Sequence, residues 1–178
     1  MATLGQRMAG AMTADVRTFE EIEKDPAALG QAVTVIVIAA LAAFLGNIFR
    51  HGLGGGLAGL IVTLIGYAVW TGIVILVGTK LMPEPSTRAD FAEGFRVIGF
   101  AASPGVFNIL AIIPFLGWLI SFIVSLWMLV IMVVAVRSVL DYTSTARAVV
   151  VCLIGLAVYC ILYVMILLPY LTARLVLG

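Results

Sequence analysis

The sequence predicts an all-α integral membrane protein, a bundle of five transmembrane helices with a short N-terminal amphipathic helix and a kinked third span. Of its 178 residues, 63% are hydrophobic and only 11% are charged, whereas soluble domains contain roughly 45–50% apolar and about 25% charged residues. The apolar residues form five runs, each near the roughly 20 residues that a spanning helix requires. We therefore expect an N-terminal segment over residues 1–30 and one membrane domain over residues 31–178.

The N-terminal segment carries an amphipathic pattern. Val16, Phe19 and Ile22 recur every three residues with charged residues between them, which predicts a short amphipathic helix. Such a helix lies either on the membrane surface or in solvent as a lead-in to the first span. Charges of both signs in residues 1–30 argue against a cleaved signal peptide, so we expect the first apolar run to remain as a membrane anchor.

The first two spans are predicted over residues 32–48 and 57–81. The glycine-rich stretch 50–56 between them is expected to form a tight connection, because glycine adopts backbone conformations that other residues resist. Gly59 and Gly66 in the second span lie seven residues apart and therefore share a helix face, which is typical of close helix packing in lipid. This spacing favours packing over a ligand site in the second span.

Residues 83–96 lead into the third span. Two prolines end the second helix, and Thr87 with Asp90 resembles the capping pair of a new one. Phe91 and Phe95 then share one face of that helix. We therefore expect an interfacial helix that continues into the third span.

The third span, over residues 96–113, contains a helix breaker and a polar amide at membrane depth. Ser103, Pro104 and Gly105 interrupt it, and Asn108 follows one turn later. Proline removes a backbone hydrogen bond and crowds the preceding turn, which predicts a kink. Two interpretations stay open: a polar site beside the break, or a kink that serves only helix packing.

The last two spans are expected over residues 119–136 and 148–168. The uncharged stretch 114–118 leaves room only for a hairpin between the third and fourth spans. A polar connection at residues 137–147 precedes the fifth span. Pro169 is expected to close that span, because proline disrupts a continuing helix.

The basic residues are distributed unevenly between the two sides of the predicted spans. Eight of the ten fall on the side of the N-terminus: Arg7, Arg17, Lys24, Lys80, Arg88, Arg96, Arg137 and Arg147. Only Arg50 and Arg174 fall on the opposite side. Because Lys and Arg accumulate in cytoplasmic loops, we expect a cytoplasmic N-terminus and a C-terminus across the membrane.

No residue pattern assembles a catalytic or metal site. The single histidine, His51, has no nearby carboxylate or cysteine, so neither a zinc site nor a histidine-based triad is expected. Ser103 has no candidate base within the apolar spans, and Cys152 and Cys160 are expected to be packing residues. A net charge of +1 does not indicate nucleic-acid binding. We therefore predict a non-enzymatic protein without metal or cofactor.

Four segments resemble the Yip family of membrane proteins in their order and spacing. They are residues 15–21 (DVRTFEE), 100–104 (FAASP), 113–118 (IPFLGW) and 144–148 (STARA). The resemblance implies five spans, a cytoplasmic N-terminus and, as in eukaryotic members, binding of Rab-type GTPases in early secretory traffic. The short N-terminal segment is similar to that of the bacterial branch, which implies the bacterial cytoplasmic (inner) membrane.

The favoured functional hypothesis is a membrane scaffold that binds membrane lipids, a protein partner or a second copy of the chain. Its expected recognition face, on the cytoplasmic side, comprises Phe19, Ile22, Arg88, Phe91, Arg96, Arg137 and Arg147. The alternative is a small oligomeric transporter or channel with a polar path at Ser103, Pro104, Gly105 and Asn108. All charged side chains can be placed at the ends of the spans or in loops, which argues against ion coupling.

Overall fold

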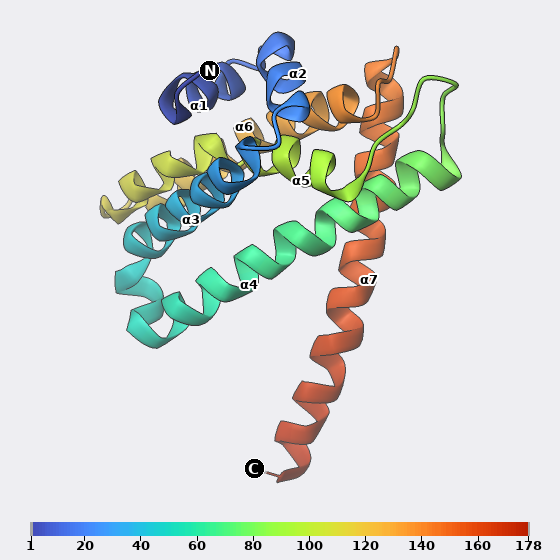
Figure 1. Cartoon of the computed structure of the whole chain (residues 1–178). Helices are drawn as coiled ribbons and strands as arrows, with labels where there is room; N and C mark the ends of the chain where they lie inside the picture. The colour runs from blue at the N-terminus through green and yellow to red at the C-terminus, as the bar shows by residue number, and fades with distance from the viewer. Residues whose placement is uncertain (1, 178) are drawn as a thin grey trace.

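The computed structural model describes residues 2–177, with side chains for residues 2–48, 59, 61–162, 164 and 165. Its elements are α1 (Leu4–Met12), α2 (Val16–Lys24), α3 (Ala28–Gly46), α4 (Ile48–Leu76), η1 (Val77–Leu81), α5 (Phe91–Phe100), η2 (Ser103–Ile112), α6 (Gly117–Val139) and α7 (Thr145–Leu177). Five stretches are long and apolar enough to cross a bilayer: Ala28–Gly46, Ile61–Leu81, Phe91–Ile112, Gly117–Val139 and Thr145–Leu162. Residues 2–177 contain no strand. The predicted all-α, five-span fold is confirmed (Figure 1).

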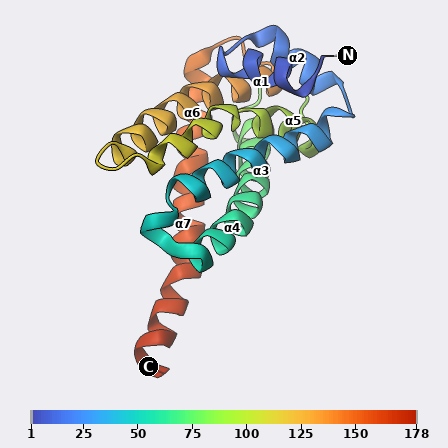
Figure 2. The same cartoon turned by 90° about the vertical axis from the view of Figure 1, so that its left-hand side faces the viewer.

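Two short helices, α1 and α2, precede the spans and lie beside the start of the bundle in both views (Figures 1 and 2). The expected amphipathic helix is α2, which begins after Asp15, whose carboxylate accepts a hydrogen bond from the Arg17 backbone N–H. Phe19 and Ile22 of its apolar face are fully buried, whereas Val16 is 44% exposed, and α2 packs on α5 and α6. This face therefore contacts the bundle and does not lie on a membrane surface.

The first helix, α1, was not expected from the sequence. It begins with a capping box in which Thr3 and Gln6 satisfy each other's free backbone N–H groups. Its Arg7 side chain is only 2% exposed and donates to the Gln31 amide oxygen at 2.9 Å and to the carboxylates of Glu21 and Asp25 at 2.9 and 2.6 Å. Arg7 thus ties α1 to α2 and α3, and the N-terminal segment is part of the folded bundle.

The non-helical connection between α3 and α4 is shorter than predicted. Asn47 alone separates α3 from α4, and its side-chain amide donates to the Ala43 carbonyl at 3.0 Å. Residues 50–56 belong to α4, so the predicted glycine-rich connection is wrong. Glycine disfavours helix by only about 1 kcal/mol per residue relative to alanine, so a helix that begins at Ile48 can continue through these glycines. The side chains of Arg50 and His51 lie outside the described residues.

The third span is made of two different helices. The α-helix α5 ends at Phe100, a turn follows at residues 101–102, and η2 continues as a 3-10 helix with Pro104 in its first turn. Proline is tolerated there because its missing N–H would have no partner in a first turn. The predicted kink is therefore confirmed, although the α-helix already ends before the proline.

The start of the third span also differs from the prediction. Asp90, rather than Thr87, caps α5, and it forms a capping box with Glu93. Thr87 is engaged elsewhere, because its hydroxyl donates to the Leu140 carbonyl oxygen at 2.9 Å. The stretch from Phe91 onward therefore belongs to the third span itself, and no separate interfacial helix precedes it.

Small residues let α3 approach η2 closely. Ala32, Ala39 and Gly46 recur every seven residues in α3 and therefore lie on one face. A methyl group added to Gly105 of η2 would sit 2.8 Å from the Ala39 Cβ, and the Asn108 carbonyl fills the space beside Gly46. The third span is accordingly held inside the bundle, with a larger buried share than any of the other four candidate spans.

The last helix is longer than predicted. α7 runs from Thr145 to Leu177 and passes through Pro169, so the predicted closure at this proline is wrong. Prolines are tolerated within transmembrane helices, because neighbouring groups re-satisfy the carbonyl that the proline leaves free. The side chains of residues 166–177 are outside the described set.

Candidate functional site

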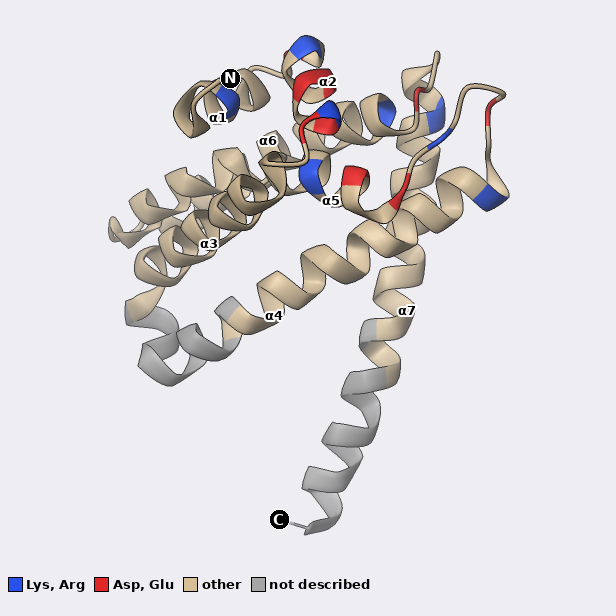
Figure 3. Ribbon diagram, viewed as in Figure 1, with Lys and Arg blue, Asp and Glu red and all other residues tan. Residues whose placement is uncertain are grey.

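The charged residues of the described part of the chain gather at one end of the bundle (Figure 3). We call residues 4–25, 80–96 and 137–147 the charged end. It contains all nine Asp and Glu residues and eight basic residues, namely Arg7, Arg17, Lys24, Lys80, Arg88, Arg96, Arg137 and Arg147. The two remaining basic residues, Arg50 and Arg174, have side chains that the structure does not describe. The eight basic residues that the sequence assigned to one side therefore do lie together.

Two loops of the charged end, residues 82–90 and 140–144, are bound to each other. Glu84 accepts a hydrogen bond from the Thr143 backbone N–H at 3.2 Å and forms an ion pair with Arg147 at 3.4 Å. The Tyr142 hydroxyl donates to the Met82 carbonyl oxygen at 2.7 Å. With the bond from Thr87 to Leu140, these contacts join loops that are more than fifty residues apart in sequence.

Two arginines of the predicted recognition face stabilise the fold through hydrogen bonds. Arg137 donates to the carbonyl oxygens of Tyr142 and Thr143 and to the Thr145 hydroxyl, so it closes the connection between α6 and α7. Arg96 is only 8% exposed and donates to the Glu23 carbonyl oxygen at 2.5 Å, which attaches α5 to α2. Both side chains hold helices and loops in place.

The predicted recognition face is only partly on the surface. Phe19 and Ile22 are fully buried and contribute to the core, so they are not available to a partner in this structure. Arg88, Phe91 and Arg147 are exposed, with Phe91 at 49%. Arg88 makes no ion pair with the described residues, whereas Arg147 pairs with Glu84. The surface part of the face is therefore centred on the start of α5 and the loop before it.

Glu23 has an unusual electrostatic setting at the charged end. Burial, followed by the negative charges of Asp141 and Glu93, raises its pKa from 4.5 to about 7. Asp25 shows the opposite effect, because the hydrogen bond from Arg7 lowers its pKa. Two carboxylates two residues apart therefore titrate in different pH ranges.

The break in the third span is tightly packed. Ser103 is 1% exposed, and its hydroxyl donates to the Phe100 carbonyl oxygen at 2.6 Å. Pro104 and Gly105 are buried as well, against α3. Asn108 is half-buried, and its backbone carbonyl lies against Gly46. These contacts favour a packing role for the break over a polar path.

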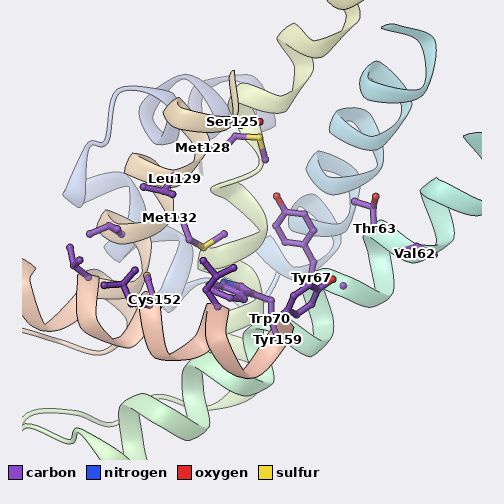
Figure 4. A pocket seen from close by; sticks show the side chains of 15 residues that line it. Val62, Thr63, Tyr67, Trp70, Ser125, Met128, Leu129, Met132, Cys152 and Tyr159 are labelled. Carbon is purple, nitrogen blue, oxygen red and sulfur yellow. The ribbon is translucent and has the colours of Figure 1, made fainter. Parts of the chain in front are cut away.

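A cavity of about 520 Å³ lies between α4, α6 and α7 (Figure 4). Gly66 and Tyr67 line it from α4, Met132 from α6, and Cys152 and Tyr159 from α7. Sequence reasoning assigned Gly66 to helix packing; the nearest atom to a methyl group there would be the Tyr159 hydroxyl, at 3.1 Å. No pattern in the sequence brings three separate spans together, so this cavity was missed.

The polar links at the charged end were missed for a similar reason. Glu84 and Tyr142 were not predicted to form these links, although Tyr142 lies in the predicted polar connection 137–147 and Glu84 in the segment 83–96 that leads into the third span. The polar composition of these two segments was the signal in the sequence that could have indicated hydrogen bonding. Composition does not indicate which segment pairs with which.

One family model matches most of the chain. The family model of the Yip1 domain matches residues 9–166, which include all five candidate spans, α2 and most of the charged end. No curated protein and no solved structure matches the chain. The four segments that resemble the Yip family all fall within the matched residues. The chain therefore belongs to the Yip1 domain family of membrane proteins.

Proposed function

We propose that this protein is a non-enzymatic membrane scaffold whose charged end binds a protein partner in the cytoplasm. The observation that carries the proposal is the pair of bound loops, beside which exposed basic and aromatic groups lie. Arg88 and Phe91 are the main ones, and Arg147 adds a basic group beside Glu84. We expect the partner to offer acidic and apolar groups.

The rigidity of these loops supports binding. Surface loops are ordinarily mobile, and ordering them on binding costs conformational entropy. Here Thr87 and Tyr142 already fix the loops to each other through hydrogen bonds of 2.9 and 2.7 Å. Arginine and aromatic side chains are also enriched among residues that dominate binding energy at interfaces. A pre-ordered surface with an exposed Arg and Phe is suited to protein recognition.

The proposed orientation rests on the distribution of positive charge. Eight basic residues lie at the charged end, and such an excess is typical of the cytoplasmic side. With five spans, the C-terminus then lies across the membrane, which we take to be the bacterial inner membrane. A Rab-type partner is implied only by the family resemblance, and a second copy of the chain is the alternative partner.

Crosslinking followed by mass spectrometry in native membranes tests this proposal. Arg88→Glu reverses an exposed charge that has no ion-pair partner among the described residues, so folding should be kept while the partner's crosslinks fall several-fold. Arg17→Glu makes the same change at an exposed residue of α2, outside the two bound loops, and should leave these crosslinks unchanged.

Unchanged crosslinks in both Arg88→Glu and Phe91→Ala would reject the charged end as the binding surface. Deleting residues 1–24 does not test partner binding alone, because the deletion also removes Arg7, Phe19 and Ile22 from the folded bundle.

A further inference from the structure

We propose that the cavity between α4, α6 and α7 binds an acyl chain of a bilayer glycerophospholipid. Its volume of about 520 Å³ falls within the roughly 300–1,000 Å³ of small-molecule sites. All three helices that enclose it are candidate membrane spans. This inference is independent of the proposed partner-binding surface, which lies at the charged end.

The rim of the cavity faces the lipid. Val62, Leu129 and Leu153 line it from α4, α6 and α7 and are 57%, 59% and 59% exposed. On spanning helices such surfaces lie in the hydrocarbon region, where lipid tails surround the protein. An acyl chain can therefore enter sideways from the bilayer without crossing water.

Two polar groups within the cavity indicate an amphiphilic occupant. The Trp70 indole N–H is buried and has no hydrogen-bond partner among the described residues. The Tyr67 hydroxyl projects into the space between the helices (Figure 4) and also forms no hydrogen bond with the part of the chain that the structure describes. Buried tryptophan and tyrosine donors ordinarily find a partner, and the hydrocarbon region offers no water. The ester carbonyl of a glycerophospholipid is an acceptor that lies at the head of an acyl chain. The structure therefore favours an esterified lipid over a plain hydrocarbon.

The size of the cavity argues against a helix of a second copy. One turn of a helix 10–12 Å across, with a 5.4 Å pitch, fills roughly 400–600 Å³, so the cavity holds about a single turn. An acyl chain is narrower and flexible. Met128 and Met132 line one wall, and methionine adapts its shape to irregular neighbours. These features suit a single chain of variable conformation.

Photocrosslinking of the full chain tests the proposal. The protein is reconstituted in vesicles of phosphatidylethanolamine and phosphatidylglycerol with a small fraction of a phospholipid that carries a diazirine on one acyl chain. We expect crosslinks to concentrate on cavity-lining peptides of α6 and α7. Cys152→Phe places a bulky ring in the cavity and should lower these crosslinks several-fold.

The chain provides a matched control in the same helix. Cys160 is exposed and does not line the cavity, so Cys160→Phe should leave the labelling unchanged. If Cys152→Phe does not fold, Tyr67→Phe serves instead, because it removes only the hydroxyl and should reduce retention of labelled phospholipid after detergent washing.

Three results would overturn the proposal. Labelling spread evenly over all lipid-facing helices would show that the cavity holds no preferred chain. Labelling by a diazirine fatty acid but not by the phospholipid would reject the esterified lipid. Crosslinks between two copies of the protein through α4, α6 and α7 would assign the cavity to self-association.

Discussion

Protonation of Glu23 affects the stability of the fold. Its burial and the nearby carboxylates of Asp141 and Glu93 raise its pKa from 4.5 to about 7. Between these two values the folded chain holds a proton that the unfolded chain releases. The contribution of Glu23 to stability is therefore complete below pH 4.5 and is lost as the pH rises through 7.

We predict that the midpoint of thermal unfolding, measured in detergent micelles, decreases between pH 4.5 and 7 because Glu23 must ionise. Glu23→Gln keeps a neutral side chain at every pH, so its midpoint should decrease less over the same range. Titration of Asp25 does not contribute over this pH range. Arg7 lowers the pKa of Asp25, so its effect on stability appears at more acidic pH. Parallel curves for the two proteins would contradict the prediction.

At the scale of elements, the contact between α3 and η2 decides how the third span is held. Gly46 ends α3, and the Asn108 carbonyl occupies the space where a side chain would begin. Close approach of this kind depends on small residues, as in many membrane helix pairs. The bundle therefore depends on the absence of a side chain at this position.

We predict that Gly46→Ala destabilises the bundle by about 1–3 kcal/mol, because the new methyl group overlaps the Asn108 carbonyl and forces the helices apart. Gly59→Ala is the control, since no atom of the described residues beyond its own stretch of helix lies within 4 Å of the added methyl group. Alanine favours helix over glycine by roughly 0.8–1 kcal/mol, so the control should be neutral or stabilising. Unfolding by denaturant in mixed micelles measures both; equal changes would contradict the packing argument.

For the molecule as a whole, the one-sided charge distribution predicts that the charged end stays in the cytoplasm. Translocating the charged end would carry eight basic residues across the membrane. We predict that a fluorescent protein fused to the N-terminus fluoresces in the cytoplasm and that alkaline phosphatase fused to the C-terminus is active outside it. Phosphatase activity from an N-terminal fusion would contradict this orientation.

Local patterns accounted for much of the fold. Apolar runs predicted five spans, the spacing of Phe19 and Ile22 predicted α2, and Pro104 predicted the kink. Some predictions from local sequence patterns were wrong, because the pattern alone did not decide the structure of the segment. The glycines at 50–56 indicated a loop, yet α4 includes them. Thr87 resembled a helix cap, but its hydroxyl binds the Leu140 carbonyl.

Five membrane spans, a bend in the third span and the positions of the charges follow from the sequence, because hydropathy and proline geometry act over a few neighbouring residues. The burial of Phe19, Ile22 and Arg7, the joining of two loops by Glu84 and Tyr142, and the cavity lined by three spans are evident only in the folded chain. These features depend on contacts between residues far apart in the chain, and no local pattern specifies such partners.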